Sequence, residues 1–288
     1  MRSNLTVVIL TLNEEKNIEL CLSSAKAIAE EIVVIDSFST DGTVSIAEKA
    51  GARVLQNNFI NYSVQRNFAL THSQIKTEWI LFLDADERVS PELSSEIIQL
   101  LQNKPQQNGF QMRRQLLWNG KWMRGGSSSI YFLRLARIKK ASFGSREVNE
   151  HMWVPGPVGK LKSFILHEDK NGIDRWHQKH LRYATLEARE FFVKKNGAAE
   201  PSISSISKKR WIHKNIWDRL PLMLRPWLYF SYRYFIRGGF LDGWQGFSYH
   251  FLQALWFQLL IGIKIYELKL NQNPLNMTAS KPVDRKAS

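Results

Sequence analysis

The stretch Trp79-Ile80-Leu81-Phe82-Leu83-Asp84-Ala85-Asp86-Glu87 decides the fold of this chain. Its unbroken apolar run predicts a strand that is buried on both faces, as in a parallel sheet. Asp84 and Asp86 follow the run, and residues two apart on an extended backbone point the same way. We therefore expect two carboxylates at the carboxyl edge of the sheet, where open α/β folds bind ligands. If the segment stood alone, an acidic turn that caps the next helix would be the better interpretation.

The residues before this stretch predict further strands and helices in alternation. Such alternation is typical of βαβ units and of a parallel sheet. Polar residues cluster just after the strands, so we expect them on one edge of that sheet. The predicted strands cover 5–11, 31–37 and 51–55, and the predicted helices cover about 12–28 and 44–50.

Asp36 lies near the end of the second predicted strand, and no basic residue is close to it in the sequence. A carboxylate in this place can accept hydrogen bonds from a ribose or from the edge of a base. The alternative is helix capping by Ser39, Thr40 or Asp41. Capping suits Asp41 better than it suits Asp36.

Two common phosphate-binding loops are absent from the sequence. No Gly-x-Gly-x-x-Gly follows the first strand, and no Gly-x-x-x-x-Gly-Lys-Ser/Thr loop occurs. A dinucleotide oxidoreductase and a phosphate-loop ATPase are therefore disfavoured. Bound phosphates would need another counter-charge, and Mg²⁺ or Mn²⁺ on Asp84 and Asp86 would supply it.

Several short motifs occur in order between residues 5 and about 100. They are Thr11-Leu12-Asn13-Glu14, Asp36 with Ser39-Thr40-Asp41-Gly42-Thr43, Gln65-Arg66-Asn67 and Asp84-Ala85-Asp86. The ordered set resembles that of family 2 glycosyltransferases, which use nucleotide-sugars and have the GT-A fold. The stretch 61–69, together with Val148-Asn149-Glu150-His151, is similar to the bacterial subgroup that adds glucose or a related sugar to the lipopolysaccharide inner core.

The resemblance implies a role for each matching residue on the donor side. Asp86 would be the main metal ligand, and Asp84 would contact the ribose or bind the metal through water. Arg66, which follows Gln65, would contact donor phosphate, although a surface helix residue is the alternative. The remaining donor-binding candidates are Thr11, Asn13 and Glu14 beside the nucleotide and Asp36 at the uracil or ribose.

Inverting transfer also needs a base that takes the proton of the acceptor hydroxyl. The resemblance points to the segment 145–151, with Glu150 as the base and Glu147 as the second candidate. On a strand these two side chains would face opposite ways, so only one would reach the site. Many relatives read Val-His-Glu here, and the departure in this chain leaves a role of His151 open.

His167 and the Gly-rich stretch 122–129 have two interpretations each. In some GT-A enzymes a histidine in this place completes the metal shell or contacts the diphosphate, and His167 resembles it. The alternative is that His167 has a structural role. The Gly-rich stretch 122–129 is either a mobile loop beside a sugar or an ordinary hairpin connection. Cys21, the single cysteine, is expected in the core, and no chelating His and Cys cluster occurs in the sequence.

Composition limits the class of protein. The chain has 288 residues, a net charge of +14 and one cysteine, so a disulfide framework is excluded and a reducing compartment is expected. Met1-Arg2-Ser3-Asn4 leads straight into a strand, so no signal peptide is expected before the fold. We therefore expect a cytoplasmic protein.

Basic residues lie mainly beyond the first hundred residues, and aromatic residues are concentrated in 211–270. Basic surface binds nucleic acid or anionic lipid, and Trp and Tyr interleaved with Arg and Lys favour the membrane–water interface. The segments 220–235 and 247–265 contain prolines or polar residues, so helices lying in the membrane plane are favoured over spanning ones. A helical subdomain packed on the catalytic domain is the alternative.

The predicted fold class is α/β, with a mixed, mainly parallel GT-A sheet flanked by helices and a C-terminal aromatic-rich helical extension. We expect a catalytic domain over 1–196, whose nucleotide-sugar half covers about 1–105 and whose acceptor half covers about 106–196. A basic, aromatic, membrane-associating region follows over 197–270, and a disordered tail over 271–288.

The predicted function is inverting, metal-dependent transfer of a hexose from a nucleotide-sugar, UDP-glucose or another UDP-hexose, to a lipid-linked saccharide acceptor. The acceptor belongs to lipopolysaccharide core or surface glycan synthesis, at an inner membrane surface with anionic lipids. No nucleic-acid partner is expected. The alternatives are a nucleic-acid-binding protein, suggested by the charge, and a non-catalytic scaffold with the same fold; donors such as GDP-mannose or UDP-GlcNAc also remain open.

Overall fold

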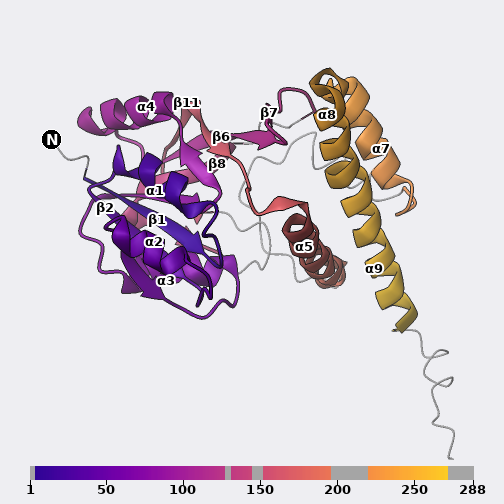
Figure 1. Cartoon of the computed structure of the whole chain (residues 1–288), viewed down its shortest axis with the longest axis horizontal. Coiled ribbons are helices and arrows are strands. Elements are labelled where there is room, and N and C mark those ends of the chain that lie inside the picture. The colour runs from indigo at the N-terminus through magenta and orange to yellow at the C-terminus, as the bar shows by residue number, and fades with distance from the viewer. Residues whose placement is uncertain (1–3, 127–130, 145–151, 196–219, 272–288) are drawn as a thin grey trace, which may run out of the picture. The chain divides into compact units, whose positions relative to one another are not determined.

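The computed structural model describes residues 4–126, 131–144, 152–195 and 220–271. The chain divides into two compact units, which are described separately. Unit 1 comprises Met1–Met123 and Ser127–Trp176, and unit 2 comprises Arg124–Gly126 and His177–Ser288. Figure 1 shows the sheet of unit 1 and the helices of unit 2.

Within the described residues, unit 1 contains a nine-stranded sheet with the order β3-β2-β1-β4-β8-β6-β11-β5, and β7 pairs with β6. Two further strands, β9 (Ser142–Phe143) and β10 (Met152–Trp153), form an antiparallel pair. The strands of the large sheet are β1 (Leu5–Thr11), β2 (Glu31–Asp36), β3 (Arg53–Gln56), β4 (Trp79–Asp84), β5 (Glu87–Val89), β6 (Gly109–Trp118), β7 (Lys121–Trp122), β8 (Tyr131–Arg137) and β11 (Val158–His167).

Apolar strands explain why the sheet is buried on both faces. Alternate residues of β1 enter different cores: Val7 and Ile9 lie in one, and Val8 and Leu10 lie in the other. Helices α1 (Ile18–Lys26), α2 (Thr43–Lys49) and α4 (Pro91–Gln102) contribute to the first core, while α3 (Tyr62–His72), β9 and β10 contribute to the second. The observed architecture confirms the predicted fold class of unit 1.

Strand direction fixes the edge at which polar groups meet. β1, β2, β3 and β4 are mutually parallel; β8 is antiparallel to β4, and β6 is antiparallel to β8. β11 is parallel to β6 and therefore runs in the same direction as β4. The last residues of β1, β2, β4 and β11, which are Thr11, Asp36, Asp84 and His167, thus lie at one carboxyl edge.

The first helix begins later than the sequence predicts. We expected a helix from residue 12, but α1 begins at Ile18. Asn13 has φ of 55°, a left-handed conformation that an α-helix does not accommodate and that Asn tolerates better than most residues. The third strand is likewise displaced, because residues 51 and 52 precede β3. Cys21 is buried as expected, and burial raises the pKa of its thiol.

Unit 2 is helical in its described residues, as predicted for the C-terminal extension. Gly239–Leu270 is, by length and composition, the one helical stretch of the described residues long and apolar enough to cross a membrane, and an 18-residue window within it has a mean hydropathy of 1.3. The elements of unit 2 include most of α5 (Gly172–Lys195), then α7 (Arg225–Ser231), π-helical turns (Tyr232–Ile236 and Phe251–Trp256), a 3₁₀ turn (Gly239–Asp242), α8 (Gly243–His250) and α9 (Phe257–Asn271).

Unit 2 encloses a short piece of the Gly-rich connection between β7 and β8. We call this piece, Arg124–Gly126, the strap. The backbone N–H groups of Arg124 and Gly125 donate to one oxygen of Asp242 at 3.0 and 2.7 Å. Arg233 donates from Nε to the Gly126 carbonyl at 2.9 Å, and Nε2 of His250 lies 3.3 Å from the Gly125 carbonyl. Neither sequence-based interpretation of this connection predicts these contacts.

Glycine is required in the strap because backbone lies directly against it. A Cβ added to Gly125 would lie 2.0 Å from the carbonyl oxygen of Gly238. A Cβ on Gly246 would lie 2.1 Å from the carbonyl oxygen of Gly239. Side chains in either place would force these segments apart, so the glycines allow the close approach.

The predicted domain limits remain predictions. The compact units divide after Trp176, so most of α5 belongs to unit 2. The predicted boundary at 196–197 falls within 196–219, which lies outside the described residues, as does nearly all of the predicted tail 271–288.

We expect the stability of unit 2 to fall on acidification through His250. Burial, followed by the charge of Arg233, lowers the pKa of His250 to about 4. An unfolded histidine titrates near 6.5, so the unfolded state takes up the proton first. The free energy of unfolding should therefore be highest above pH ~6.5 and decrease by up to ~3 kcal/mol as the pH falls to ~4.

Urea unfolding followed by tryptophan fluorescence across this pH range tests the expectation. The His250→Gln variant should lose this component of the pH dependence. The matched control is His72→Gln, because His72 is exposed on α3. An unchanged pH dependence in His250→Gln would exclude His250 as its source.

Candidate functional site

The connections after β1 and β2 are held together by side-chain hydrogen bonds. Backbone N–H of Asn13 donates to Ser39 Oγ at 2.8 Å, and backbone N–H of Glu14 donates to Thr43 Oγ1 at 2.7 Å. In return, Asn13 Oδ1 accepts from the Thr40 backbone N–H at 2.7 Å. The left-handed turn at Asn13 and the loop after Asp36 therefore form one surface at the carboxyl edge.

Asp36 is fully buried beneath this surface. Its carboxylate accepts hydrogen bonds from Thr11 Oγ1 at 2.8 Å, from Ser39 Oγ at 2.5 Å and from the Ser39 backbone N–H at 2.8 Å. Asp41 makes comparable turn bonds to the Thr43 and Glu15 backbone N–H groups. Asp36 thus shapes the loop in this conformation, and its direct contact with a nucleoside stays a prediction.

Glu14 joins this surface to the segment after β11. Its carboxylate accepts from the side-chain amides of Asn17 and Asn171 at 2.7 and 2.9 Å. Arg175 lies 3.3 Å from the other oxygen and also donates to the Leu12 carbonyl at 2.6 Å. Thr11, Asn13 and Glu14 are therefore brought together with Asp36, as the sequence predicts, but mainly as a hydrogen-bonded framework.

Helix α3 carries Gln65 and Arg66 to the same edge. Its first turn is capped by Asn61, whose side chain accepts from the Val64 backbone N–H at 2.9 Å. Gln65 donates to Ser37 Oγ at 2.7 Å, just beyond β2. Arg66 is buried and donates to Asp84 Oδ1 at 2.8 Å at the end of β4. The interpretation of Arg66 as a surface helix residue is therefore wrong.

Asp84 lies at the centre of a cluster of ion pairs. Its carboxylate is 2.8 Å from Arg66, 3.0 Å from Arg134 and 3.3 Å from Arg114. Glu87, which is 1% exposed, pairs with Arg114 and lies 3.5 Å from Arg134. Glu87 also accepts from the Asp84 backbone N–H at 2.9 Å, which fixes the end of β4.

The arginines keep Asp84 ionised. Burial alone would raise the pKa of the Asp84 carboxyl, but the charges of Arg134, Arg66 and Arg114 outweigh burial and hold that pKa well below its ordinary value. The side chains come from α3, β6 and β8, so the cluster joins the parallel strands to the second half of the sheet.

Asp86 occupies a different environment from Asp84. β4 ends at Asp84, and Asp86 lies in the turn before β5, so the expectation that both carboxylates project from one strand is wrong. Asp86 Oδ1 lies 3.4 Å from His167 Nδ1 at the end of β11. The side chains of Asp86 and His167 are 10% and 21% exposed.

The pair of Asp86 and His167 fits a divalent cation better than Asp84 does. His167 Nδ1 is buried and accepts or donates no hydrogen bond within the described residues. A carboxylate oxygen and an imidazole nitrogen suit Mn²⁺, and Mg²⁺ takes one or two carboxylates plus substrate phosphates. The described residues contain no group of three or more His, Cys, Asp or Glu that could hold a metal, so phosphates would have to complete the shell.

Sequence reasoning did not assign roles to Glu87, Arg114 and Arg134. Their signal is weak, since an Arg or Glu in a predicted strand has no local feature that identifies its partner. The base candidates Glu147 and Glu150, with His151, lie outside the described residues. Their position relative to the carboxyl edge therefore stays a prediction.

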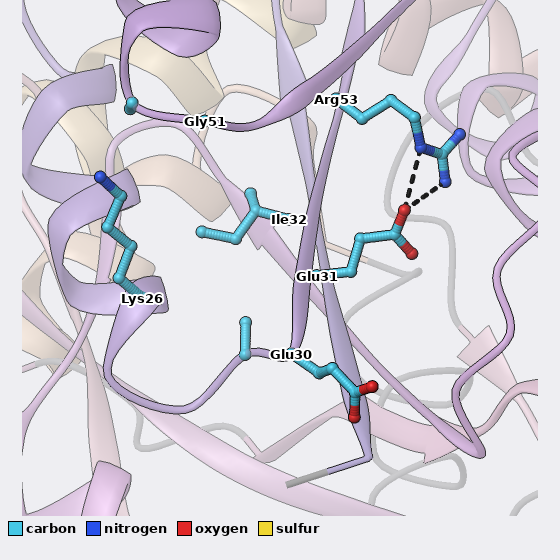
Figure 2. A pocket seen from close by; sticks show the side chains of 8 residues that line it. Lys26, Glu30, Glu31, Ile32, Gly51 and Arg53 are labelled. Carbon is cyan, nitrogen blue, oxygen red and sulfur yellow. Dashed lines mark hydrogen bonds and ion pairs between the residues drawn. The ribbon is translucent and has the colours of Figure 1, made fainter. Parts of the chain in front are cut away.

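A cavity of about 330 Å³ lies at the opposite, amino-terminal edge of the sheet (Figure 2). It is lined by residues that include Lys26, Glu30 and Gly51. Figure 2 also shows Glu31 and Arg53 paired with each other, at 2.6 Å. Because these charges neutralise one another and lie away from Asp86, the cavity is separate from the candidate site.

Comparison with known proteins gives a consistent result. A family model described as "Glycosyl transferase family 2" matches residues 6–152, just over half of the chain. A Rickettsia bellii protein described as an uncharacterized glycosyltransferase is 29% identical over 95% of this chain and 90% of its own length. The lipopolysaccharide core biosynthesis glycosyltransferase LpsC of Rhizobium meliloti is 29% identical over 87% of this chain and 90% of its own length.

Among solved structures, TarS residues 1–349 of S. aureus resembles this chain with a TM-score of 0.44 and 14% identity, over 94% of this chain and 92% of that one.

We expect Arg134→Met to destabilise unit 1, because it leaves Asp84 and Glu87 with less counter-charge in a buried setting. Removing one partner of a buried ion pair costs ~3–5 kcal/mol, and we expect about 3 here since Arg66 and Arg114 remain. Urea unfolding measures the difference.

The matched control is Arg53→Met. Arg53 pairs with Glu31 in solvent, with 39% of its side chain exposed, so the loss should be ~0–1 kcal/mol. Equal losses in the two variants would contradict the importance of the buried cluster.

Proposed function

The chain belongs to glycosyl transferase family 2, and we propose that it is an inverting, metal-dependent hexosyltransferase. The proposed donor is a UDP-hexose, with UDP-glucose the first choice. The proposed acceptor is a lipid-linked saccharide of lipopolysaccharide core or surface glycan synthesis. Similarity to a lipopolysaccharide core glycosyltransferase over most of both chains supports this class of acceptor.

The observation that carries the proposal is the pair of Asp86 and His167 at the carboxyl edge, 3.4 Å apart. Open α/β sheets bind ligands outside this edge, and the loop surface around Asn13 and Ser39 lies at the same edge. No Gly-rich phosphate loop is present to hold a diphosphate, so a metal ion is the natural counter-charge.

Each residue of the site has a proposed role. Asp86 and His167 hold Mg²⁺ or Mn²⁺, with Asp84 acting through water or at the ribose. A bound metal neutralises the leaving diphosphate. Arg66 and its neighbours Arg114 and Arg134 add positive charge beside the phosphates. The nucleoside lies against the surface of Thr11, Asn13, Glu14 and Asp36, which Gln65 supports.

Proton transfer is assigned to the segment before β10. Glu150 is the proposed general base for the acceptor hydroxyl, and Glu147 is the second candidate. The carboxylate would accept the hydroxyl proton as the oxygen attacks the anomeric carbon and the bond to the diphosphate breaks, which inverts that carbon.

The proposed location is the cytoplasmic face of the inner membrane, with peripheral association through the aromatic helical region. A net charge of +14 favours anionic lipid, and a lipid-linked acceptor would be found at that surface. A nucleic-acid role is not proposed, because the residues at the carboxyl edge include a carboxylate–imidazole pair that suits a cation.

We expect Asp86→Ala to abolish metal-dependent donor binding and to lower the rate of transfer at least about a hundredfold, or ~3 kcal/mol of transition-state stabilisation. Calorimetric titration with UDP-glucose in Mn²⁺, and then in EDTA, measures the binding. Glu48→Ala, which removes an exposed carboxylate on α2, is the matched control. Wild-type donor affinity in Asp86→Ala would refute the metal assignment.

We expect Glu150→Gln to retain donor binding and to lose transfer by about a hundredfold or more, because a general base contributes ~10²–10⁴-fold. Initial rates and donor titrations on the same preparation separate these two effects. Glu147→Gln is the paired variant. Full activity in Glu150→Gln together with loss in Glu147→Gln would move the base to Glu147.

A further inference from the structure

Unit 2 exposes a set of apolar side chains between the π-helical turn that follows α7 and the start of α8. The exposed fractions are 59% for Phe235, 75% for Ile236, 48% for Phe240, 71% for Leu241 and 69% for Trp244. These five residues, within ten positions of sequence, are called the apolar tip. Soluble monomers rarely expose large apolar side chains this close together, and such patches mark interaction surfaces.

The exposure of the apolar tip is built into the fold. Between its members lie Gly239 and Asp242, which are buried. Asp242 accepts two backbone hydrogen bonds from the strap, and the Gly126 backbone N–H donates to the Arg237 carbonyl at 2.8 Å. Gly239 and Asp242 therefore face the interior of unit 2, and the large apolar side chains around them are left facing outward.

The charged residues near the apolar tip indicate which kind of partner surface the tip can bind. From Leu220 to Tyr266 the sequence contains a single carboxylate, Asp242, and it is buried. Arg237 lies in the middle of the apolar tip and is exposed, and Arg225 at the start of α7 is partly exposed. An apolar surface with exposed cations and no exposed carboxylate is complementary to anionic lipid headgroups above acyl chains.

The neighbouring helix extends the same surface. Trp227, Leu228 and Tyr232, on and just after α7, are 54%, 43% and 48% exposed. Trp and Tyr favour the headgroup level of a bilayer, where the ring is partly apolar and its polar atom stays hydrated. The composition of the whole surface therefore changes from apolar at the tip to amphipathic along α7.

A second copy of the chain fits this surface less well than a bilayer does. In a symmetric dimer the same patch faces itself, so Arg237 would be brought near the partner's Arg237. No exposed carboxylate between residues 220 and 266 is available to pair with either charge. Like charges at a dry interface are unfavourable, whereas phosphate headgroups would neutralise them.

A spanning helix fits less well than a docked one. The stretch Gly239–Leu270 has the length to cross a bilayer, but Asp242 and His250 within it are committed to contacts with the strap. His180 also lies 3.2 Å from Gln253 in the same stretch. Removing these polar groups from their partners and exposing them to lipid would be costly.

We propose that the apolar tip inserts into the headgroup and upper acyl region of an anionic bilayer and is the membrane-docking element of this protein. The proposal rests on the proposed function in taking the protein to associate peripherally with a membrane that holds its acceptor, and it names the residues that dock; docking itself requires no catalysis. Arg237 contacts anionic headgroups while Ile236, Leu241 and Trp244 enter the apolar region.

Sedimentation of the full chain with sucrose-loaded vesicles tests the proposal. Vesicles of phosphatidylglycerol and phosphatidylcholine are compared with vesicles of phosphatidylcholine alone, at low and high salt. We expect binding to the anionic vesicles that weakens with salt. The double variant Ile236→Ser/Leu241→Ser should lower the partition coefficient at least about tenfold, because two large side chains lose their burial in lipid.

The matched control is Ile60→Ser. Ile60 is 69% exposed but belongs to unit 1, so its substitution should leave vesicle binding unchanged. Arg237→Gln should weaken binding to anionic vesicles and leave the small residual binding to neutral vesicles unchanged. Circular dichroism and urea unfolding establish that each variant is folded before it is compared.

Defined outcomes would overturn the proposal. The first is vesicle binding by the double variant that equals that of the wild type, and the second is an equal loss of binding in Ile60→Ser and the double variant. The third is a wild-type chain that does not bind vesicles but forms a dimer, when the double variant is a monomer. Retention in membranes after alkaline carbonate extraction would instead establish a spanning helix. Donor titration on the wild-type chain keeps the two proposals separate. Absence of vesicle binding by the wild-type chain with intact donor binding rejects only the apolar tip, and vesicle binding without donor binding rejects only the enzymatic assignment.

Discussion

Asp84, at the end of β4, is kept ionised because the guanidinium groups of Arg66, Arg114 and Arg134 surround it, and the last two also pair with the buried Glu87. A buried carboxylate without a partner costs several kcal/mol, so the arginines must be in place when the sheet forms. They come from α3, β6 and β8, which are distant in sequence. The ion-pair cluster therefore ties the parallel half of the sheet to its antiparallel half, and the carboxyl edge depends on it.

The cluster also gives Asp84 and Asp86 different partners. Asp84 is bound by Arg66, Arg114 and Arg134, so little of its charge remains for a cation. Asp86, placed in the following turn, is instead beside His167. The cluster has three guanidinium groups and two carboxylates, so it carries a net positive charge beside the carboxylate–imidazole pair, an arrangement suited to a metal-bound diphosphate.

Local sequence signals located the strands of the first half of unit 1 better than its first helix. The apolar run before Asp84 and the strand ending at Asp36 follow from periodicity and position, whereas the helix expected from residue 12 begins at Ile18. The role expected for Arg66 came from the family resemblance and not from periodicity. What local signals could not give were pairings between distant segments. Arg114 and Arg134 meet Asp84 only because β6 and β8 pair beside β4, and no residue of either strand encodes that neighbour. The turn after Asp84 was missed for a related reason, since the Glu87 side chain that caps the end of β4 is fixed by those same arginines.

The strap gives unit 2 a second covalent connection to unit 1, which a simple C-terminal tail would lack. Arg124–Gly126 belongs to unit 2, while Met123 and Ser127 on either side belong to unit 1, so the chain enters unit 2 in the middle of the β7–β8 connection as well as after Trp176. The backbone N–H groups of the strap have Asp242 as their acceptor. Removal of residues 177–288 would leave these N–H groups without that partner, so the strap would lose the contacts that hold its conformation, and the apolar tip would be lost as well. The strap that holds the tip in shape therefore lies in the connection that follows β7, and truncation of the C-terminal helices cannot remove the tip without also altering the strap.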